Sequence, residues 1–234
     1  MGSLHPLQVV TVFAEDYPEL RRDDLPPGWL STAEEVVLDG MRFPARRRKW
    51  LLGRIAAKLA IGYQLEGPAG TAPPPTEIVI GNHDSGQPFA TVCGERYDRP
   101  LSISHRDPIG VAAVGLPGTS IGVDIEMVEP RDPALVSDFF TEREATAVTA
   151  ARGRDATMLV ARTWSGKEAV LKALGLGLRR DTRTIEVGPE LPGPDQPLPL
   201  WRPLAVTLSD PPAGTLSLSW SDGQRYLLTL AIVA

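Results

Sequence analysis

The feature that most constrains the fold is a helical pattern over residues 45–64. Arginine and lysine fill much of this segment, and apolar side chains recur in it near the α-helical period. The apolar positions are Trp50, Leu51, Ile55, Leu59 and Tyr63. A helix of this kind has to bury its apolar face against another layer of structure, while its basic side faces solvent or an anion.

Strands are predicted on both sides of this helix. Short alternating or β-branched runs bounded by Gly or Pro indicate them. These runs lie at residues 7–13, 77–81, 101–104, 111–116, 120–126, 204–208, 215–220 and 225–233. Ser221, Asp222 and Gly223 predict a hairpin turn between the last two.

Two further helix starts are predicted from capping-box spacing, in which Ser or Thr is followed three residues later by Glu. Thr141 with Glu144 and Ser165 with Glu168 have this spacing, and Gly175 is suited to end the second helix. Each half of the chain then carries strands and one long helix.

Proline-rich stretches at residues 67–76 and 188–203 predict loops or linkers. The chain divides most easily near residues 117–119. We therefore predict an α+β fold with two halves of similar size, residues 1–118 and 119–234, although no sequence repeat is detectable between them.

Composition and charge exclude several classes of protein. The chain has 234 residues, 42% of them hydrophobic and 23% charged, as in proteins with a packed core. A net charge of -5 argues against a nucleic-acid partner. The absence of a long apolar run and of a signal-peptide pattern argues against a membrane span and predicts a cytoplasmic protein. One cysteine, Cys93, and three histidines exclude an ordinary zinc cluster.

The segment at residues 120–126 carries two acidic residues on a predicted strand. Asp124 and Glu126 are two positions apart, so their side chains point to the same face, while Val123 and Ile125 point into the core. Two adjacent ionised carboxylates repel each other, and a bound cation, a basic partner or a raised pKa of one of them would relieve this repulsion. An ion that prefers oxygen ligands, such as Mg²⁺, suits them. The alternative is a solvated strand end.

Residues 164–172 add a third carboxylate and two lysines. Glu168 and Lys172 share a helix face at i and i+4, whereas Lys167 and Lys172 lie far apart around the helix. Glu168 and Lys172 are therefore the natural functional pair. The alternative is that Glu168 completes a capping box with Ser165 and that Lys172 is its surface ion-pair partner.

A histidine and a basic run are further candidates for binding an anion. His105 follows Ser104 at the end of a predicted strand, where it would bind an anion or move a proton, or serve as a structural donor. Residues 46–49 form either a solvated helix face or a site for a phosphorylated small molecule. The commonest phosphate-loop, serine-hydrolase and zinc-protease motifs are absent from the sequence.

Taken in order, three motifs resemble the 4′-phosphopantetheinyl transferase superfamily. They are Ser102-Ile103-Ser104-His105, then Ile121-Gly122-Val123-Asp124-Ile125-Glu126, then Trp164-Ser165-Gly166-Lys167-Glu168-Ala169-Val170-Leu171-Lys172. Chain length resembles that of the surfactin-synthetase-activating type, in which two similar α+β halves fold within one chain in a pseudo-twofold arrangement. The resemblance implies a monomer.

The resemblance implies an enzyme that transfers the phosphopantetheine arm of coenzyme A to a serine of an apo acyl, polyketide or peptidyl carrier protein and releases adenosine 3′,5′-bisphosphate. Asp124, Glu126 and Glu168 would surround Mg²⁺. Glu168 would also remove the proton of the carrier serine, and Lys172 would offset charge on the pyrophosphate or protonate the leaving group.

The resemblance implies that Ser104 and His105 contact phosphates of coenzyme A and that Lys172 contacts its pyrophosphate. Arg47, Lys49 and Lys167 are further predicted coenzyme A contacts, and Arg47 and Lys49 have no clear match in the family pattern. Gln87 lies between Gly86 and Pro88 in a short loop before the histidine motif. It departs from the family pattern, because members often carry Lys or Arg at this position. This departure leaves room for a second hypothesis, a non-catalytic module that binds coenzyme A or a carrier protein. A third is a Mg²⁺-dependent nucleotide pyrophosphatase.

Overall fold

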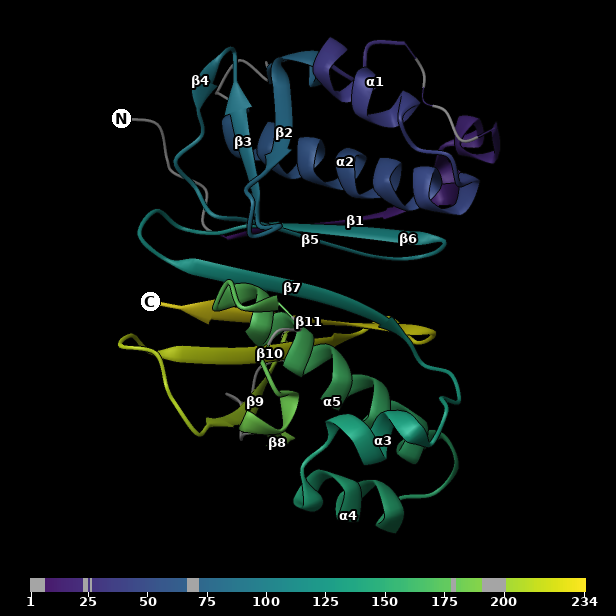
Figure 1. Ribbon diagram of the computed structural model, residues 1–234, viewed down its shortest axis with the longest axis vertical. Coiled ribbons are helices and arrows are strands. Elements are labelled where there is room, and N and C mark those ends of the chain that lie inside the picture. Colours follow the sequence, from purple (N-terminus) through teal and green to yellow (C-terminus); the bar gives the residue numbers. More distant parts are fainter. Residues whose placement is uncertain (1–6, 23–24, 26, 67–71, 178–179, 191–200) are drawn as a thin grey trace. The chain divides into compact units, whose positions relative to one another are not determined.

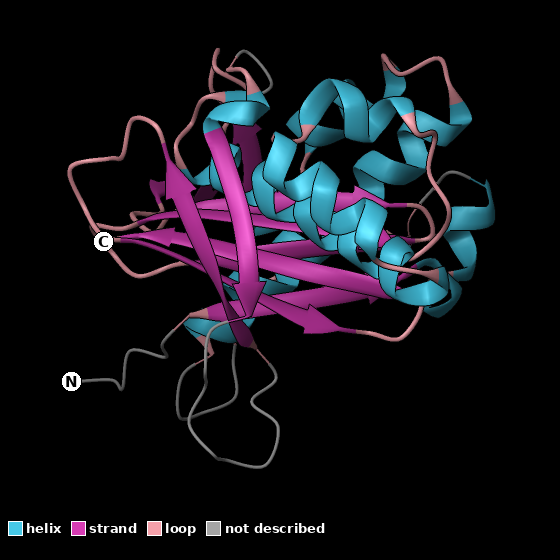
Figure 2. Ribbon diagram, turned by 90° about the horizontal axis from the view of Figure 1, so that it is seen from below, coloured by secondary structure: helices cyan, strands magenta, loops and turns pink. Residues whose placement is uncertain are grey.

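The computed structural model describes residues 7–22, 25, 27–66, 72–177, 180–190 and 201–234. The chain divides into two units, Met1–Thr119 and Ser120–Ala234. Each unit contains both helices and strands (Figure 1), and Figure 2 colours the helices cyan and the strands magenta. The predicted α+β class is therefore confirmed.

The first unit is built around one long helix. Its elements in chain order are β1 (Gln8–Phe13), the 3₁₀ turns η1 (Ala14–Asp16) and η2 (Pro18–Arg22), α1 (Thr32–Asp39), α2 (Pro44–Leu65), η3 (Pro75–Glu77), β2 (Ile78–Asn82), β3 (Pro88–Val92), β4 (Glu95–Arg96), β5 (Leu101–Arg106) and β6 (Ile109–Val114). Two antiparallel sheets have the orders β1-β6-β5 and β2-β3-β4. Figure 1 shows α2 between α1 and the first of these sheets.

Helix α2 is the element predicted over residues 45–64. It begins at Pro44, a residue suited to the first turn of a helix because no hydrogen bond is lost there. Leu51 and Ile55 on its apolar face are completely buried. A Cβ added at Gly53 would lie 2.9 Å from Ile103 Cγ2, so this glycine lets α2 approach β5 closely.

The second unit is a single five-stranded sheet with helices. Its elements are β7 (Ser120–Met127), α3 (Ala134–Phe139), α4 (Glu142–Ala150), α5 (Gly153–Ala173), the 3₁₀ turn η5 (Thr182–Thr184), β8 (Ile185–Glu190), β9 (Arg202–Leu208), β10 (Leu216–Asp222) and β11 (Tyr226–Val233). The strand order is β7-β11-β10-β9-β8, antiparallel throughout. Helix α5 packs across β7 and β11, with α3 and α4 further from the sheet (Figure 1).

The contact between α5 and β7 depends on Gly122. A Cβ at this position would lie 1.9 Å from Ala169 O and 2.6 Å from Ala173 N, both in the backbone of α5. Only glycine allows so close an approach. The glycine that precedes the acidic pair in sequence therefore seats the helix that carries Glu168 directly on the strand that carries Asp124.

The two units contain the same buried ion-pair arrangement. In the first, Glu34 completes the capping box of α1 and pairs with Lys58 of α2 at 2.7 Å. In the second, Glu144 completes the capping box of α4 and pairs with Lys167 of α5 at 2.8 Å. All four side chains are buried.

The remaining bonds of these ion pairs also correspond. Each ammonium donates to two carbonyls beside the strand that follows its helix, at Pro75 and Ile78 in the first unit and at Thr182 and Ile185 in the second. Each carboxylate accepts a backbone N–H from that strand, as in Val187 to Glu144 at 2.7 Å. The halves thus repeat a set of contacts that local sequence similarity does not reveal.

The predicted helix start at Ser165 is wrong, whereas the capping box at Thr141 is confirmed. Helix α5 begins at Gly153, and Ser165 is completely buried in its interior. The Ser165 hydroxyl is hydrogen-bonded to Thr229 Oγ1 at 2.8 Å rather than to the backbone of a first turn. The helical period of residues 153–164 is diluted by polar side chains, so only the second half of the helix stood out.

The structure also contains elements that the sequence patterns did not indicate. Helices α1 and α3 and strands β3, β4 and β8 were not predicted. They are short and lie beside Gly- and Pro-rich turns, so they lack the repeated apolar period on which prediction depends.

The part of the chain described here contains no helix with the length and apolar character needed to cross a membrane.

Candidate functional site

The two carboxylates of β7 are buried in the second unit. Asp124 is 5% exposed and Glu126 is 9% exposed, opposite Thr229 and Leu227 of β11. They are therefore not a solvated strand end. Buried carboxylates need compensating charge or hydrogen bonds, because desolvation of an isolated charge is costly.

Lys172 supplies compensating charge to Asp124. Its Nζ lies 2.7 Å from Asp124 Oδ1 and donates a second hydrogen bond to Val123 O at 3.1 Å. Helix α5 thus reaches across to β7 through this lysine. Lys172 lies four residues after Glu168 in the helix, yet its ion pair joins two elements rather than lying along the helix surface.

Glu168 is the least compensated of the acidic residues around this point. Its Oε1 is buried and has no hydrogen-bond partner among the described residues. The pKa of Glu168 is raised from 4.5 to about 7, chiefly by burial. The negative charge of Asp124 and, to a smaller extent, that of Glu126 also raise it, whereas Lys172 lowers it. The three predicted carboxylates therefore influence one another electrostatically.

Glu126 pairs with an arginine that the sequence analysis did not single out. Arg131 Nη2 forms a short ion pair with Glu126 Oε2 and lies 3.9 Å from Glu129 Oε1. Arg131 follows β7 by a few residues and lies in the segment that leads to α3. Spacing alone gave no signal for this pair, because the segment has no regular period.

The residues around Glu168 have the chemistry of a site for a hard cation. Three carboxylates supply only oxygen ligands, which suits Mg²⁺, and Glu168 Oε1 lacks a partner among the described residues. Within that part of the chain no three Asp, Glu, His or Cys side chains are already gathered as a metal cluster. Lys172 and Arg131 instead hold two of the carboxylates.

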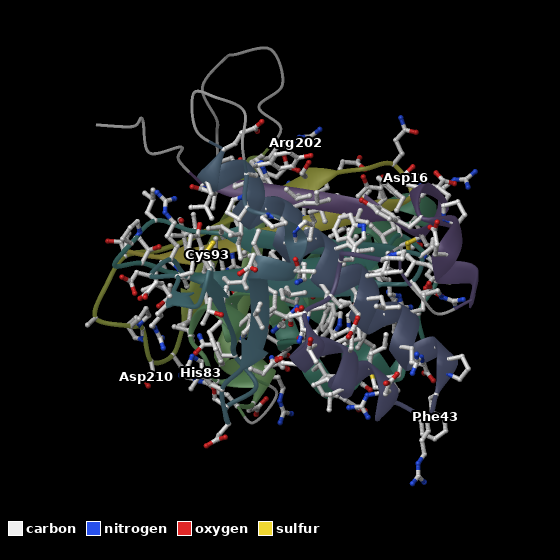
Figure 3. All side chains as sticks on the ribbon, turned by 90° about the horizontal axis from the view of Figure 1, so that it is seen from above. Asp16, Phe43, His83, Cys93, Arg202 and Asp210 are labelled. Atoms are coloured by element: carbon white, nitrogen blue, oxygen red, sulfur yellow. The ribbon has the colours of Figure 1, made fainter. Side chains whose placement is uncertain are left out.

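The first unit contains a basic cavity of about 680 Å³. Lys49 and His105, two of the predicted anion-binding residues, both line it. Arg46, Lys49 and Trp50 of α2 recur at helical spacing along its wall. Phe43, labelled in Figure 3, also lines the cavity and is 70% exposed.

Arg54 is a cavity residue that the sequence analysis did not assign to a site. It is 7% exposed, stacks on the Trp50 ring at 4.5 Å and donates to Asn82 Oδ1 at 3.2 Å. Burial lowers its pKa to about 10, against the opposing charge of Glu34. A guanidinium so poorly hydrated is well suited to an anionic group of a ligand.

Three other predicted site residues have different surroundings. Arg47 donates to Leu38 O at 2.6 Å and so bonds the end of α1. Ser104 is buried. It is the neighbour of His105 in β5, so the two side chains point to opposite faces of the strand. Lys167 is completely buried against Glu144, and burial lowers its pKa. Their contacts with coenzyme A stay predictions.

The predicted site residues fall into two groups, each within one unit. Asp124, Glu126, Glu168 and Lys172 interact in the second unit. Lys49 and His105 share the cavity of the first unit.

Comparison with known proteins gives matches to phosphopantetheinyl transferases. Residues 120–199 match the family model described as the 4'-phosphopantetheinyl transferase superfamily. The 4'-phosphopantetheinyl transferase HetI of Nostoc sp. is 27% identical over 201 residues, which cover 83% of this chain and 80% of the relative. A putative 4'-phosphopantetheinyl transferase of Synechocystis sp., slr0495, is 28% identical over 158 residues, which cover 65% of this chain and 61% of the relative.

A solved structure is also similar over part of the chain. It is a holo-(acyl-carrier-protein) synthase from Bacillus anthracis in complex with CoA (3',5'-ADP), which is 23% identical, covers 47% of this chain and 92% of its own, and has a TM-score of 0.38. Asp124, Glu126, Glu168 and Lys172 all lie in the segment, residues 120–199, that matches the superfamily model.

Proposed function

We propose that this protein is a phosphopantetheinyl transferase that moves the phosphopantetheine arm of coenzyme A to a serine of an apo carrier protein. The observation that carries the proposal is the electrostatic coupling of Glu168 to Asp124, Glu126 and Lys172 inside the segment that matches the superfamily. The surfactin-synthetase-activating type remains the finer hypothesis, together with a cytoplasmic monomer.

Asp124, Glu126 and Glu168 would hold Mg²⁺. When bound, the ion would offset negative charge on the pyrophosphate of coenzyme A. The half-buried carboxylate of Glu168, with its pKa raised to about 7, is compensated only in part by Lys172 in its charged form, and a divalent cation would supply the remaining compensation.

The transfer step needs one new bond and one broken bond. The serine oxygen of the carrier forms a bond to the phosphorus next to the pantetheine arm, while the bond from that phosphorus to the bridging oxygen breaks. Adenosine 3′,5′-bisphosphate leaves with the electron pair of the broken bond. Glu168 accepts the serine proton, directly or through a water molecule, and Lys172 offsets charge on the departing phosphate or protonates it.

The basic cavity of the first unit is the proposed site for phosphates of coenzyme A. Lys49, Arg54 and His105 line it and offer cationic or hydrogen-bonding groups. Arg54 would supply charge where neutral Gln87 replaces the basic residue common in the family. The carrier protein would present an exposed serine on a folded apo domain.

The test is incubation with coenzyme A, Mg²⁺ and a panel of apo carrier domains, followed by mass spectrometry of the carriers. We expect at least one carrier to gain the arm, and Glu168→Gln to lower the rate by about 100-fold or more. Glu186→Gln is the matched control, since Glu186 pairs with exposed Arg143 instead.

Other outcomes favour the remaining hypotheses. Binding of coenzyme A without transfer to any carrier would favour the non-catalytic module. Release of phosphopantetheine in the absence of a carrier would favour the pyrophosphatase. Either result, with every carrier left unmodified, would contradict the transferase.

A further inference from the structure

Both acidic side chains of β7 are already paired with a cation from their own chain. Asp124 pairs with Lys172, and Glu126 pairs with Arg131. The side chains of Arg131 and Glu126 are 18% and 11% exposed, so solvent screens this pair less than a surface pair. A divalent cation that approaches Glu126 would therefore meet a guanidinium beside the same carboxylate.

The two cations differ in how firmly they are held. Lys172 bonds both Asp124 and the backbone carbonyl of Val123, so its departure would break two bonds. The polar contacts of Arg131 among the described residues are with the carboxylates of Glu126 and Glu129. Arg131 therefore keeps a carboxylate partner when it leaves Glu126, whereas Lys172 would lose both of its bonds.

A second partner for Arg131 is already within reach. Glu129 Oε1 lies 3.9 Å from Arg131 Nη2, and the Glu129 side chain is 47% exposed. The guanidinium therefore lies between an inner carboxylate on β7 and an outer one in the segment that follows. A change of side-chain torsions would transfer it from the first to the second, without a change in the fold.

There is also space for this movement. Arg131 and Glu129 line a cavity of about 520 Å³ that α3, α4 and α5 border. The cavity lies within the second unit, and Val136 and Val160 contribute apolar surface to it. Arg131 thus borders open space that Glu129 also borders.

We propose that Arg131 is a positioning residue that controls access of a divalent cation to Glu126. It pairs with Glu126 when the cation is absent and moves to Glu129 when the cation binds. Arg131 thus competes with the cation, and Glu129 favours the loaded state. The proposal rests on the magnesium site put forward under the proposed function.

The test is a double-mutant cycle on the affinity of the full chain for Mn²⁺, an ion that uses the same oxygen ligands as Mg²⁺. Free Mn²⁺ is counted by electron paramagnetic resonance in the absence of coenzyme A. Arg131→Gln should lower the dissociation constant about five- to tenfold, and Glu129→Gln should raise it about two- to fivefold. In the Arg131→Gln background, Glu129→Gln should then have almost no effect.

This loss of effect separates the proposed movement from simple long-range charge effects. If the two substitutions add independently, each charge acts through space and the proposal is wrong. Arg131→Lys keeps the positive charge and should stay within about twofold of wild type. Arg143→Gln removes an exposed arginine of the same unit and is the control for net charge.

The experiment also separates this proposal from the metal site itself. Loss of Mn²⁺ binding in Glu126→Gln and Glu168→Gln, with no change in Arg131→Gln, would keep the site and overturn the role of Arg131. Mn²⁺ binding that survives both carboxylate substitutions would overturn the site, and the role of Arg131 with it. Circular dichroism of each variant shows whether the fold is retained.

Discussion

At the scale of single residues, Glu168 differs most from an ordinary side chain of its type. Its pKa of about 7 has two causes, desolvation and the nearby carboxylates of β7, and Lys172 offsets them only in part. A carboxyl group with such a pKa exchanges its proton near neutral pH. This property suits a group that accepts a proton from a serine hydroxyl.

The raised pKa of Glu168 predicts how stability depends on pH. In the folded protein Glu168 holds its proton up to about pH 7, whereas in the unfolded chain it loses it near pH 4.5. The folded state therefore binds more protons between these values, and this residue lowers the free energy of unfolding as pH rises from about 4.5 to 7. Glu168→Gln lacks this loss because glutamine stays neutral.

Urea unfolding in metal-free buffer at several pH values checks this prediction. The stability of Glu168→Gln relative to wild type should increase as pH rises through this window and change little above it. Glu186→Gln shows what the loss of a carboxylate elsewhere in the unit does. Parallel curves for Glu168→Gln and wild type would contradict an uncompensated buried carboxyl group.

At the scale of elements, the site depends on the seating of α5 on β7. Gly122 makes this possible because its missing Cβ leaves room for the backbone of α5 at Ala169. The strand contributes Asp124 and Glu126, and the helix contributes Glu168 and Lys172. A shift of the helix relative to the strand would therefore separate the residues that have to act together.

We expect Gly122→Ala to lower both stability and transfer activity. The added methyl group would have to push α5 away from β7, with a cost of about 1–3 kcal/mol or more. Gly166→Ala is the matched control, because its Cβ would lie 3.1 Å from Val187 Cγ2, a side-chain atom with some freedom to move. Urea denaturation and carrier modification measure the two effects. Equal, small effects of both substitutions would contradict the close approach at Gly122.

At the scale of the whole molecule, the two units divide the proposed binding functions. The carboxylates and Lys172 belong to the second unit, and the basic cavity belongs to the first. The units share a buried capping-box Glu paired with a helix Lys, Glu34 with Lys58 and Glu144 with Lys167. The two halves therefore contain the same kind of structural ion pair while their polar sites differ.

This division predicts that binding of coenzyme A and of a divalent cation can be weakened separately. Lys49→Gln should weaken coenzyme A binding about tenfold, because a charged donor to phosphate is lost, and leave Mn²⁺ affinity within about twofold. Asp124→Asn should instead weaken Mn²⁺ binding about tenfold or more. Calorimetry with each ligand alone measures both effects.

Arg48→Gln is the control for Lys49→Gln. Arg48 is the neighbouring basic residue of α2 but pairs with Asp107 rather than lining the cavity. We expect coenzyme A affinity to stay within about twofold in this variant. An equal loss of affinity in both variants would show that net charge, and not the cavity, attracts coenzyme A.

Much of the fold could be predicted because helices and strands have local periods. The twenty-two-residue helix α2 was predicted almost to its ends, and the final hairpin of β10 and β11 was found from its turn. The superfamily resemblance is confirmed by the match over residues 120–199. The predicted helix start at Ser165 is wrong because a spacing typical of a helix start also occurs inside a helix. There, burial decides which group the hydroxyl is hydrogen-bonded to.

The sequence by itself determined the α+β class, the order of the acidic and basic motifs, and the chemical type of each candidate group. Only the tertiary structure decided which charges meet: Arg131 on Glu126, Lys167 on Glu144, and Lys172 on Asp124. It also decided that Glu168 is left with a raised pKa. The physical reason is that helices and strands follow from the spacing of residue types along the chain. The desolvation and the ion pairs of a side chain depend instead on which residues packing brings beside it.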